Sequence, residues 1–534
     1  MLVPVNVRSD PGIKRDGTKF EGNAYVDGQW VRFQRGLPRK IGGYRRLTNY
    51  ITGIVRQFHT QALNNFVYTH VGHANGVQRF TIDENGNPSS PVDRSPVGYP
   101  QQEQIMWMFD AMFDGAGGDT VLIAHGAETA NDISSGVNRP AYIGNIYDTS
   151  ALTEIPTPGV CGGIVVLHPY LFMYCKNGYI KWSDANDPTN FTSGDAGDAF
   201  IAASKIVKGL PLRGGGQSPA GIFWTLDSVI RATYTGGANV FSFDTITASS
   251  SILSANSVIE HDGIFYWIGI DRFLMYNGVV REVENRMNLN YFFEGLNFKW
   301  ANKVFAFKVP RFGEIWWCYP RGEATECTHA VIYNYRENTW YDCELPNGGR
   351  SAGIYAQVFR SPLLAGCLPS ESAPGDARVT ETVESRITED GSFRVTDTGY
   401  DLYKIWRHET GVNEVDGTQV NAVESYFETG DIALLLADPA KNKALRVEMI
   451  EPDFVQSGDM QVYVTGRINA RAPEVNGPLR TFPDQPSEVY EQQVFLKEQR
   501  RELRFRFISN TVNGDYQMGQ VIAHVEPADG RYQS

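Results

Sequence analysis

The chain has 534 residues, a length that predicts two or more domains because a single hydrophobic core stops growing at about 250–300 residues. Its composition, 42% hydrophobic and 20% charged, excludes a disordered chain. The formal net charge of −13 argues against a protein that grips nucleic acid tightly, because such proteins carry a basic footprint. The charge does not exclude a surface past which nucleic acid slides.

The first fifty residues are predicted to form an extended segment, 1–50, that helps to complete the domain after it. They do not begin with a basic stretch followed by a long apolar core, so no signal peptide is expected, and no apolar run approaches 18 residues. Their distinctive feature is a cluster of basic side chains in an otherwise acidic chain. The cluster consists of Arg32, Arg35, Arg39, Lys40, Arg45 and Arg46.

Short hydrophobic runs separated by turn residues follow from 51 to 367. Tyr170–Tyr174 turns through Asn177-Gly178 into Tyr179–Trp182, and Ile264–Ile268 leads into Phe273–Tyr276. Runs of four to six β-forming residues between turn signals predict strands, and Asn-Gly is a strong hairpin turn because both residues tolerate positive φ. The region is therefore predicted to be a succession of small antiparallel hairpins.

These hairpins recur at a regular interval. The leading hydrophobic residues are 55, 50, 51, 42 and 51 residues apart, and they are Phe66, Val121, Leu171, Ile222, Ile264 and Ile315. A period near 50 with several short strands in each unit is typical of a β-propeller. The fold class predicted for this part is an all-β propeller, and the alternative is a run of unrelated hairpins in a β-sandwich.

The composition of the chain changes after Cys367. The segment 368–399 is polar and acidic and is predicted to be a linker or exposed excursion. Beyond it, Ala444–Phe454, Met460–Thr465 and Leu503–Ile508 alternate polar and apolar residues, which predicts half-buried antiparallel strands. We therefore expect a second, sandwich-like β domain over 400–534.

A second basic cluster lies in this domain and consists of Lys497, Arg500, Arg501, Arg504 and Arg506. Glu498 and Glu502 alternate with these side chains. One interpretation is a solvated strand face. The alternative hypothesis is that both clusters are contact surfaces for an acidic partner chain, or make local contacts to nucleic acid.

No motif predicts a catalytic, cofactor or metal site. Arg213–Gly216 is rich in glycine but lacks the Gly-Lys-Ser/Thr ending of a phosphate loop, and Trp182–Phe191 does not have calcium-loop spacing. His59, His70 and His73 are close in sequence without a metal-binding pattern, so we expect them to be structural. The six cysteines form no C-x-x-C pair, which favours buried reduced thiols.

The order of these parts resembles the tail nozzle, or tail hub, proteins of short-tailed bacteriophages, a family also called packaged-DNA stabilisation proteins. Three places carry the resemblance: the basic segment Gly28–Leu47, the central run Gly221–Gly269, and the terminal strands Ala444–Phe454 with Glu498–Ile508. The likeness spans nearly the whole chain, but its motifs are diffuse.

The resemblance implies a β-propeller with an added β domain that forms a six-fold ring below the adaptor ring of the portal. Such a ring extends and closes the channel that retains double-stranded DNA and supports fibres, a spike or a needle. It also implies a virion protein without enzymatic activity or cofactors, assembled in the bacterial cytoplasm. Two alternatives remain open, namely a tail protein that binds host-surface glycans and a propeller enzyme that degrades them.

Overall fold

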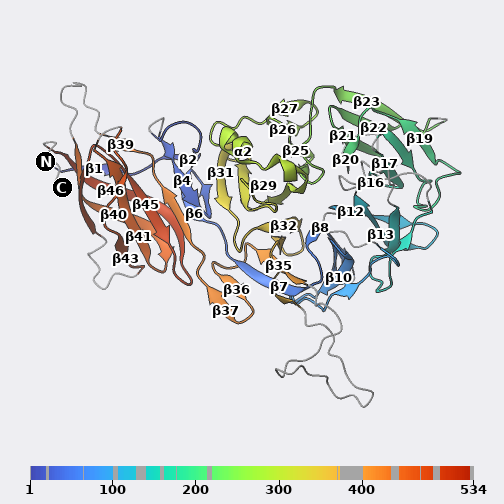
Figure 1. The fold of residues 1–534 in the computed structure, drawn as a ribbon, viewed down its shortest axis with the longest axis horizontal. Helices are drawn as coiled ribbons and strands as arrows, with labels where there is room; N and C mark the ends of the chain where they lie inside the picture. Colours follow the sequence, from blue (N-terminus) through green and yellow to red (C-terminus); the bar gives the residue numbers. More distant parts are fainter. Residues whose placement is uncertain are drawn as a thin grey trace, which may run out of the picture.

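A computed structural model describes residues 2–19, 23–63, 65–99, 106–127, 140–156, 162–175, 177–212, 219–237, 239–369, 371–372, 401–433, 444–468, 471–484 and 493–528. Almost every regular element in these ranges is a β-strand. The strands form a propeller, on the right of Figure 1, and a sandwich, on the left, in which both chain ends lie. The predicted fold class, a propeller body with a C-terminal sandwich-like domain, is confirmed by this sheet topology.

Six blades of the propeller are four-stranded antiparallel sheets in sequence order. They are blade 1, β8 (Val55–Leu63), β9 (Phe66–His73), β10 (Gly76–Ile82) and β11 (Val92–Asp93); blade 2, β12 (Met106–Asp114), β13 (Asp119–Ala127), β14 (Ala141–Asn145) and β15 (Thr153–Glu154); blade 3, β16 (Gly163–Leu167), β17 (Tyr170–Tyr174), β18 (Tyr179–Trp182) and β19 (Gly197–Phe200); blade 4, β20 (Ile206–Pro211), β21 (Ala220–Thr225), β22 (Val229–Tyr234) and β23 (Phe241–Thr247); blade 5, β24 (Ile259–His261), β25 (Ile264–Ile268), β26 (Phe273–Tyr276) and β27 (Val280–Glu282); and blade 6, β28 (Phe305–Val309), β29 (Glu314–Tyr319), β30 (His329–Asn334) and β31 (Thr339–Glu344).

The predicted leading strand of each unit is the second strand of a blade. This strand is the most hydrophobic one because neighbouring blades cover both of its faces; all residues of β17, β21 and β29 are buried. The short helices α2 (Leu289–Gly295) and η1 (Phe298–Lys303) connect blades 5 and 6.

The seventh blade is assembled from both sides of the propeller sequence. Its strands are β32 (Arg350–Ala356), β33 (Ser361–Gly366), β35 (Asp401–His408) and β7 (Tyr44–Ile51), in that order. The strand β32 lies against β8 of blade 1, which closes the ring. Beyond β7 lies the hairpin β36 (Glu414–Asp416) and β37 (Gln419–Asn421), while β34 (Glu371–Ser372) pairs with β35.

The sandwich is also shared between the two chain ends. One sheet has the order β44 (Val494–Arg500), β40 (Leu445–Ser457), β46 (Asp515–Pro527), β6 (Leu37–Lys40) and β5 (Val31–Gln34), with β1 (Val3–Asn6) on β46. The other has the order β4 (Asp27–Gln29), β38 (Ser425–Glu428), β45 (Glu502–Ser509), β41 (Met460–Arg467) and β42 (Val475–Asn476), with β39 (Ile432–Ala433) on β45 and β43 (Arg480–Phe482) on β41. The strands β2 (Asp10–Ile13) and β3 (Ala24–Tyr25) form a small parallel pair.

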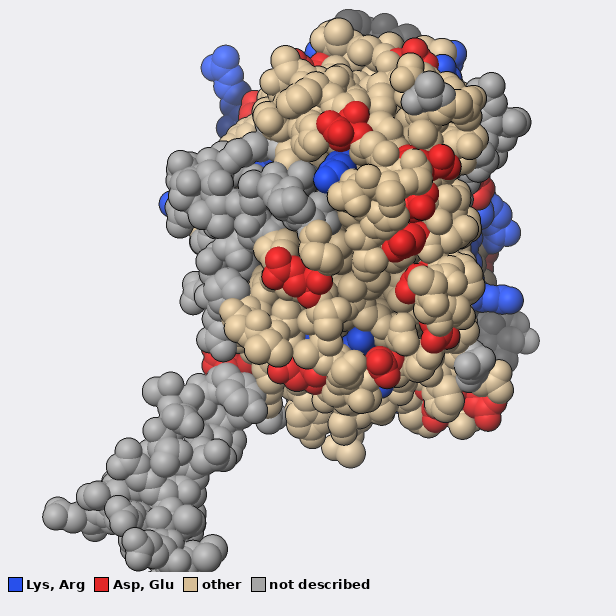
Figure 2. Space-filling model, turned by 90° about the vertical axis from the view of Figure 1, so that its right-hand side faces the viewer, with Lys and Arg blue, Asp and Glu red and all other residues tan. Residues whose placement is uncertain are grey.

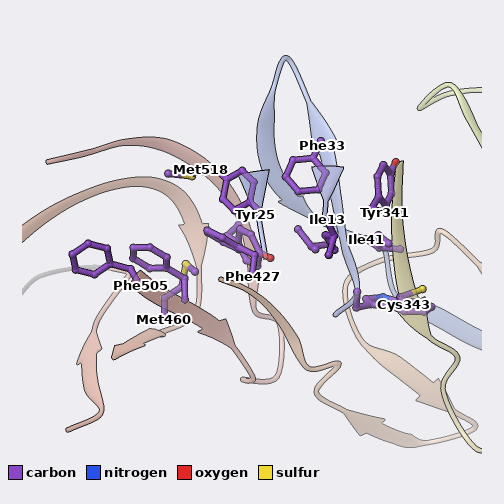
Figure 3. Close-up of a cluster of buried hydrophobic side chains, with 14 of the residues drawn as sticks. Ile13, Tyr25, Phe33, Ile41, Tyr341, Cys343, Phe427, Met460, Phe505 and Met518 are labelled. Carbon is purple, nitrogen blue, oxygen red and sulfur yellow. Dashed lines mark hydrogen bonds between the residues drawn. The ribbon is translucent and has the colours of Figure 1, made fainter. Parts of the chain in front are cut away.

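A continuous hydrophobic core joins the sandwich to blade 6 through the N-terminal segment (Figure 3). Tyr25 packs edge-on against Phe427 of the sandwich, with ring centroids 5.7 Å apart. Phe33 packs in the same way against Tyr341 of blade 6, at 5.5 Å. Because one segment fills both interfaces, the two domains share a core instead of being joined by a flexible linker.

These sheets divide the chain differently from the predicted boundaries. Of the segment 1–50, only β7 belongs to the propeller. The strands β1, β4, β5 and β6 belong to the sheets of the sandwich. The region 401–421 lies within the predicted C-terminal domain, but its strands belong to the sheet of blade 7. The local sequence pattern does not show this division, because the same alternation of residues suits a strand in either sheet. The predicted linker 368–399 lies largely outside the described residues.

Candidate functional surfaces

Arg32, the first member of the predicted basic cluster, is only 1% exposed and cannot present its charge to a partner. Its Nε lies 2.8 Å from Oε1 of Glu314 in blade 6, and Nη1 donates to Oε2 of Glu409 at 3.0 Å. Burial lowers the pKa of this guanidinium, but the two carboxylates outweigh burial and raise it. Arg32 therefore links the hairpin of β5 and β6 to blade 6, and also to Glu409, which directly follows β35 of blade 7.

Arg504 in the second cluster is also buried, at 1% exposure. Its guanidinium donates to Glu428, Glu474 and Asp431, the last at 3.3 Å. The hydrogen bond from Arg504 lowers the pKa of Glu474. The docking hypothesis is therefore wrong for Arg32 and Arg504, because buried groups surrounded by carboxylates are structural links.

The other basic candidates divide into paired and exposed side chains. Lys40 is 3% exposed and donates to the carbonyl of Gly514 at 2.7 Å, so docking is excluded for it too; burial lowers its pKa to about 8. Partners within the chain also occupy Arg39 (Gln34), Arg46 (Asp416), Arg500 (Glu498) and Arg506 (Asp27), while Arg501 is half-buried. The exposed members are Arg35, Arg45 and Lys497.

Side chains cross the centre of the propeller. Nε2 of Gln57, on the inner strand of blade 1, donates to Oδ1 of Asn256 at 3.2 Å. Asn256 immediately precedes blade 5, which is not a neighbour of blade 1 in the ring. The major groove of duplex DNA is by itself wide enough to admit an α-helix, so the whole duplex is much wider than a hydrogen bond between two side chains. The centre of a single subunit is therefore too narrow for duplex DNA.

The side of the propeller remote from the sandwich is acidic (Figure 2). Residues 106–247, which build blades 2 to 4, contain 13 Asp or Glu and 7 Lys or Arg. Among the described residues of these blades Arg231 is the one Lys or Arg that is exposed, and it lies 3.7 Å from Asp244. We call the exposed carboxylates of blades 2 to 4 the acidic rim; they belong to Asp148, Glu154, Asp195, Asp198, Asp227 and Asp244.

An ionic cluster that the sequence did not indicate lies where the ring closes. Arg56 of blade 1 is 3% exposed and makes two hydrogen bonds to Glu326 of blade 6, at 2.6 and 2.9 Å. Lys303 donates to the same carboxylate at 2.5 Å and lies 4.3 Å from the centre of the Trp300 ring. The cluster lines a cavity of about 460 Å³. No sequence signal links Arg56 and Glu326, which are 270 residues apart.

The turn that follows β18 is held by hydrogen bonds within the chain, and the described cysteines are buried. Asp184, in the segment Trp182–Phe191, accepts hydrogen bonds from the backbone NH groups of Ala185 and Asp195, and these bonds cap the turn. The five described cysteines are buried and free, and the described residues contain no group of His, Cys, Asp or Glu arranged to hold a metal. Cys161 and Arg213–Gly216 lie outside the described residues. No helix in the described ranges has the length and apolar character needed to cross a membrane.

Comparison with known proteins leaves the family open. No protein-family profile and no curated protein sequence matches the chain. Among solved structures, the chain is similar to the crystal structure of the computationally designed Ika8 protein, at a TM-score of 0.35 and 10% identity. The alignment covers 68% of this chain and 99% of the designed protein. A TM-score this low carries no argument about this chain.

Proposed function

We propose that this chain is the subunit of a tail nozzle, a six-fold ring in the tail of a short-tailed bacteriophage. The ring docks below the adaptor of the portal, extends the DNA channel, retains the packaged genome and supports a fibre, spike or needle. It is assembled in the bacterial cytoplasm and acts structurally, without catalysis. The sequence resemblance motivates the proposal, and the acidic rim is the structural observation that carries it.

An acidic wall suits a DNA channel for an electrostatic reason. Duplex DNA carries one negative charge per about 1.7 Å of its axis, so a wall of carboxylates repels it and prevents adhesion during passage. Because Gln57 and Asn256 cross the centre of the propeller, the channel must lie between copies of the chain. Acidic rims turned inward in a ring would line such a channel.

The first experiment is to examine particles grown without this protein. Filled heads that lose their DNA, with tails ending at the adaptor, are expected if the protein closes the channel. Full heads with complete tails that fail to adsorb would overturn the nozzle proposal and favour the alternative of a glycan-binding receptor protein.

A second experiment tests the rim. Replacing Asp148, Asp195, Asp198 and Asp244 by Asn should leave ring assembly intact, but should slow DNA ejection and make the isolated ring retain DNA at low salt. A matched control removes four exposed carboxylates of blade 5 and the turns beside it, Asp262, Asp271, Glu282 and Glu284, whose side chains are 84, 61, 51 and 66% exposed. Equal effects of the two variants would exclude a specific role of the rim.

A further inference from the structure

Two buried arginines attach blade 1 to blade 2, its neighbour in the ring (Figure 1). Arg94, which directly follows β11, is fully buried, and Arg79 of β10 is 8% exposed. Both donate to backbone carbonyls of the turn that follows β14 in blade 2. Nε of Arg94 donates to Ser150 at 2.9 Å, and Nη1 of Arg79 donates to Tyr147 and, at 2.7 Å, to Asp148. The two guanidinium groups therefore hold this turn against blade 1.

Neither arginine has a carboxylate within ion-pair distance among the described residues. A buried charge without an opposite charge is costly. Accordingly, burial and the neighbouring Arg79 lower the pKa of Arg94 to about 10. The contact between the two blades is thus held by cations that have only neutral acceptors nearby.

One of these neutral acceptors is the imidazole of His70, on the second strand of blade 1. Its Nε2 lies 3.0 Å from Nη1 of Arg94, and the whole side chain is buried. A guanidinium has only donors and stays protonated in proteins, so Nε2 of His70 must carry the lone pair. The hydrogen bond therefore exists only while this nitrogen of His70 is unprotonated.

Further basic groups flank His70 within the sheet of blade 1. His59 on β8 and Arg79 on β10 are its directly opposed partners on the two neighbouring strands. Directly opposed side chains lie on the same face of a sheet, and the two histidine rings are 6.1 Å apart between centroids. Burial, His59, Arg94 and Arg79 together hold the pKa of His70 well below 6.5.

The elements packed against His70 do not compensate these charges. Blade 2 presents apolar and tyrosine side chains to this face of blade 1, and the tyrosines stay neutral at acidic pH. The side chains that form this core with Val77 are Tyr68, Tyr99, Trp107, Phe109, Leu122, Ala124 and Tyr142. The carboxylate of Asp148 is exposed and acts on Arg79 and Arg94, but it is not among the groups that shift the pKa of His70. Asp93 is also exposed, and its Oδ1 accepts from Ser95.

The other histidines of these two blades point away from His70. His73 lies three positions further along β9, so its side chain is on the opposite face of blade 1. His125 of β13 shares its face with Val121 and Ile123, which belong to the core between blades 2 and 3. Among the described histidines of these blades, His70 is therefore the one bonded to an arginine that holds the turn of blade 2.

We propose that the contact between blades 1 and 2 is an acid-sensitive joint, in which uptake of one proton by Nε2 of His70 removes the hydrogen bond from Arg94 and releases the turn after β14. The proton comes from solvent, and no other bond is made or broken covalently. The released turn carries Asp148, so opening changes the exposed surface of blade 2. All of these contacts lie within one chain, so the joint does not depend on the proposed ring.

The size of the effect follows from proton linkage. In the open joint His70 is solvated and has an ordinary pKa of about 6.5, whereas the closed joint keeps it neutral. The closed joint is therefore favoured above pH 6.5 and loses stability as the pH falls below that value. Each further pH unit multiplies the open population by ten, which gives a rise of about thirtyfold between pH 7.5 and pH 5.

Amide hydrogen exchange of the full-length protein, followed by mass spectrometry at pH 7.5 and pH 5, measures this rise. The backbone NH of Leu152 donates to the carbonyl of Arg94 at 3.1 Å and reports directly on the joint. After correction for the intrinsic pH dependence of exchange, peptides that contain Leu152 should lose protection about thirtyfold. Peptides from blade 6 should keep their protection.

Two histidine variants separate the joint from general acid sensitivity. In His70→Gln the amide oxygen can accept from Arg94 but cannot take up a proton, so the loss of protection at Leu152 should fall to about threefold or less. The matched control is His73→Gln, on the same strand but the opposite face, which should leave the full loss at Leu152.

Unchanged protection of Leu152 in the natural protein, or an equal loss in His70→Gln, would overturn the proposal. A measurement without any substitution covers the case in which His70→Gln does not fold. Exchange of the C2 hydrogen of each histidine in the natural protein, followed by mass spectrometry as the pH is varied, gives the pKa of His70. A pKa well below 6.5 is expected, and a pKa at or above 6.5 would overturn the proposal.

Discussion

Replacing Arg32 by Met tests whether the N-terminal basic cluster is a structural link. The substitution keeps much of the side-chain volume but leaves Glu314, which is fully buried, without its cation. Breaking a buried ion pair from one side costs about 3–5 kcal/mol. Glu314 retains hydrogen bonds from Trp316 and Tyr341, at 2.9 and 2.6 Å, so we expect a loss near the lower end, about 3 kcal/mol.

Urea unfolding followed by tryptophan fluorescence would measure this loss. Trp30 and Trp316, whose ring centroids are 6.1 Å apart, lie beside the cluster and should report its opening. The double variant Arg32→Met, Glu314→Gln removes the uncompensated charge and should recover part of the stability.

The control for this experiment is Arg35→Gln, an exposed change that should stay within about 0.5 kcal/mol of the natural protein. A loss below about 1 kcal/mol in Arg32→Met would refute the structural role of the cluster. A stable Arg32→Met protein that fails to assemble would instead restore the docking interpretation.

Two further predictions concern buried and turn residues. Burial lowers the pKa of His73 to about 4 from 6.5, so the unfolded chain binds more protons below pH 6.5 and stability is lost as the pH falls. The loss from this residue is about 2 kcal/mol between pH 7 and pH 5, and His73→Gln should remove that part of the pH dependence in denaturation curves. The next prediction compares the Asn-Gly turns at 177–178 and 277–278: Gly278→Ala should cost about 1–2 kcal/mol through its φ of +104° alone. Gly178→Ala should cost clearly more in the same assay, because a Cβ there would lie 1.9 Å from the carbonyl oxygen of Ala202. Equal losses of stability in the two variants would show that the backbone around Gly178 shifts readily to make room for the added methyl group.

The repeated blades could be predicted from the sequence because their signals are local. Strands β17, β25 and β26 have the bounds that their hydrophobic runs indicate, and glycines with positive φ, Gly178 and Gly278, lie in the turns that follow β17 and β26. The inner strand of blade 1, β8, escaped prediction because it mixes polar residues such as Gln57 and His59 with apolar ones. Its pattern reflects the crowded centre of the ring and not a solvent-exposed face.

The sequence by itself determined the all-β class, the period of the blades and the second β domain, because side-chain alternation and turn chemistry act over a few residues. Only the tertiary structure decided which strands complete blade 7 and which of the basic residues are exposed. Arg32 meets Glu314 across 282 residues of chain, and Arg45 meets Arg407 across a strand pair that joins the two ends of the propeller. Charge is visible in a sequence, but its burial and its partners depend on contacts between residues far apart in the chain.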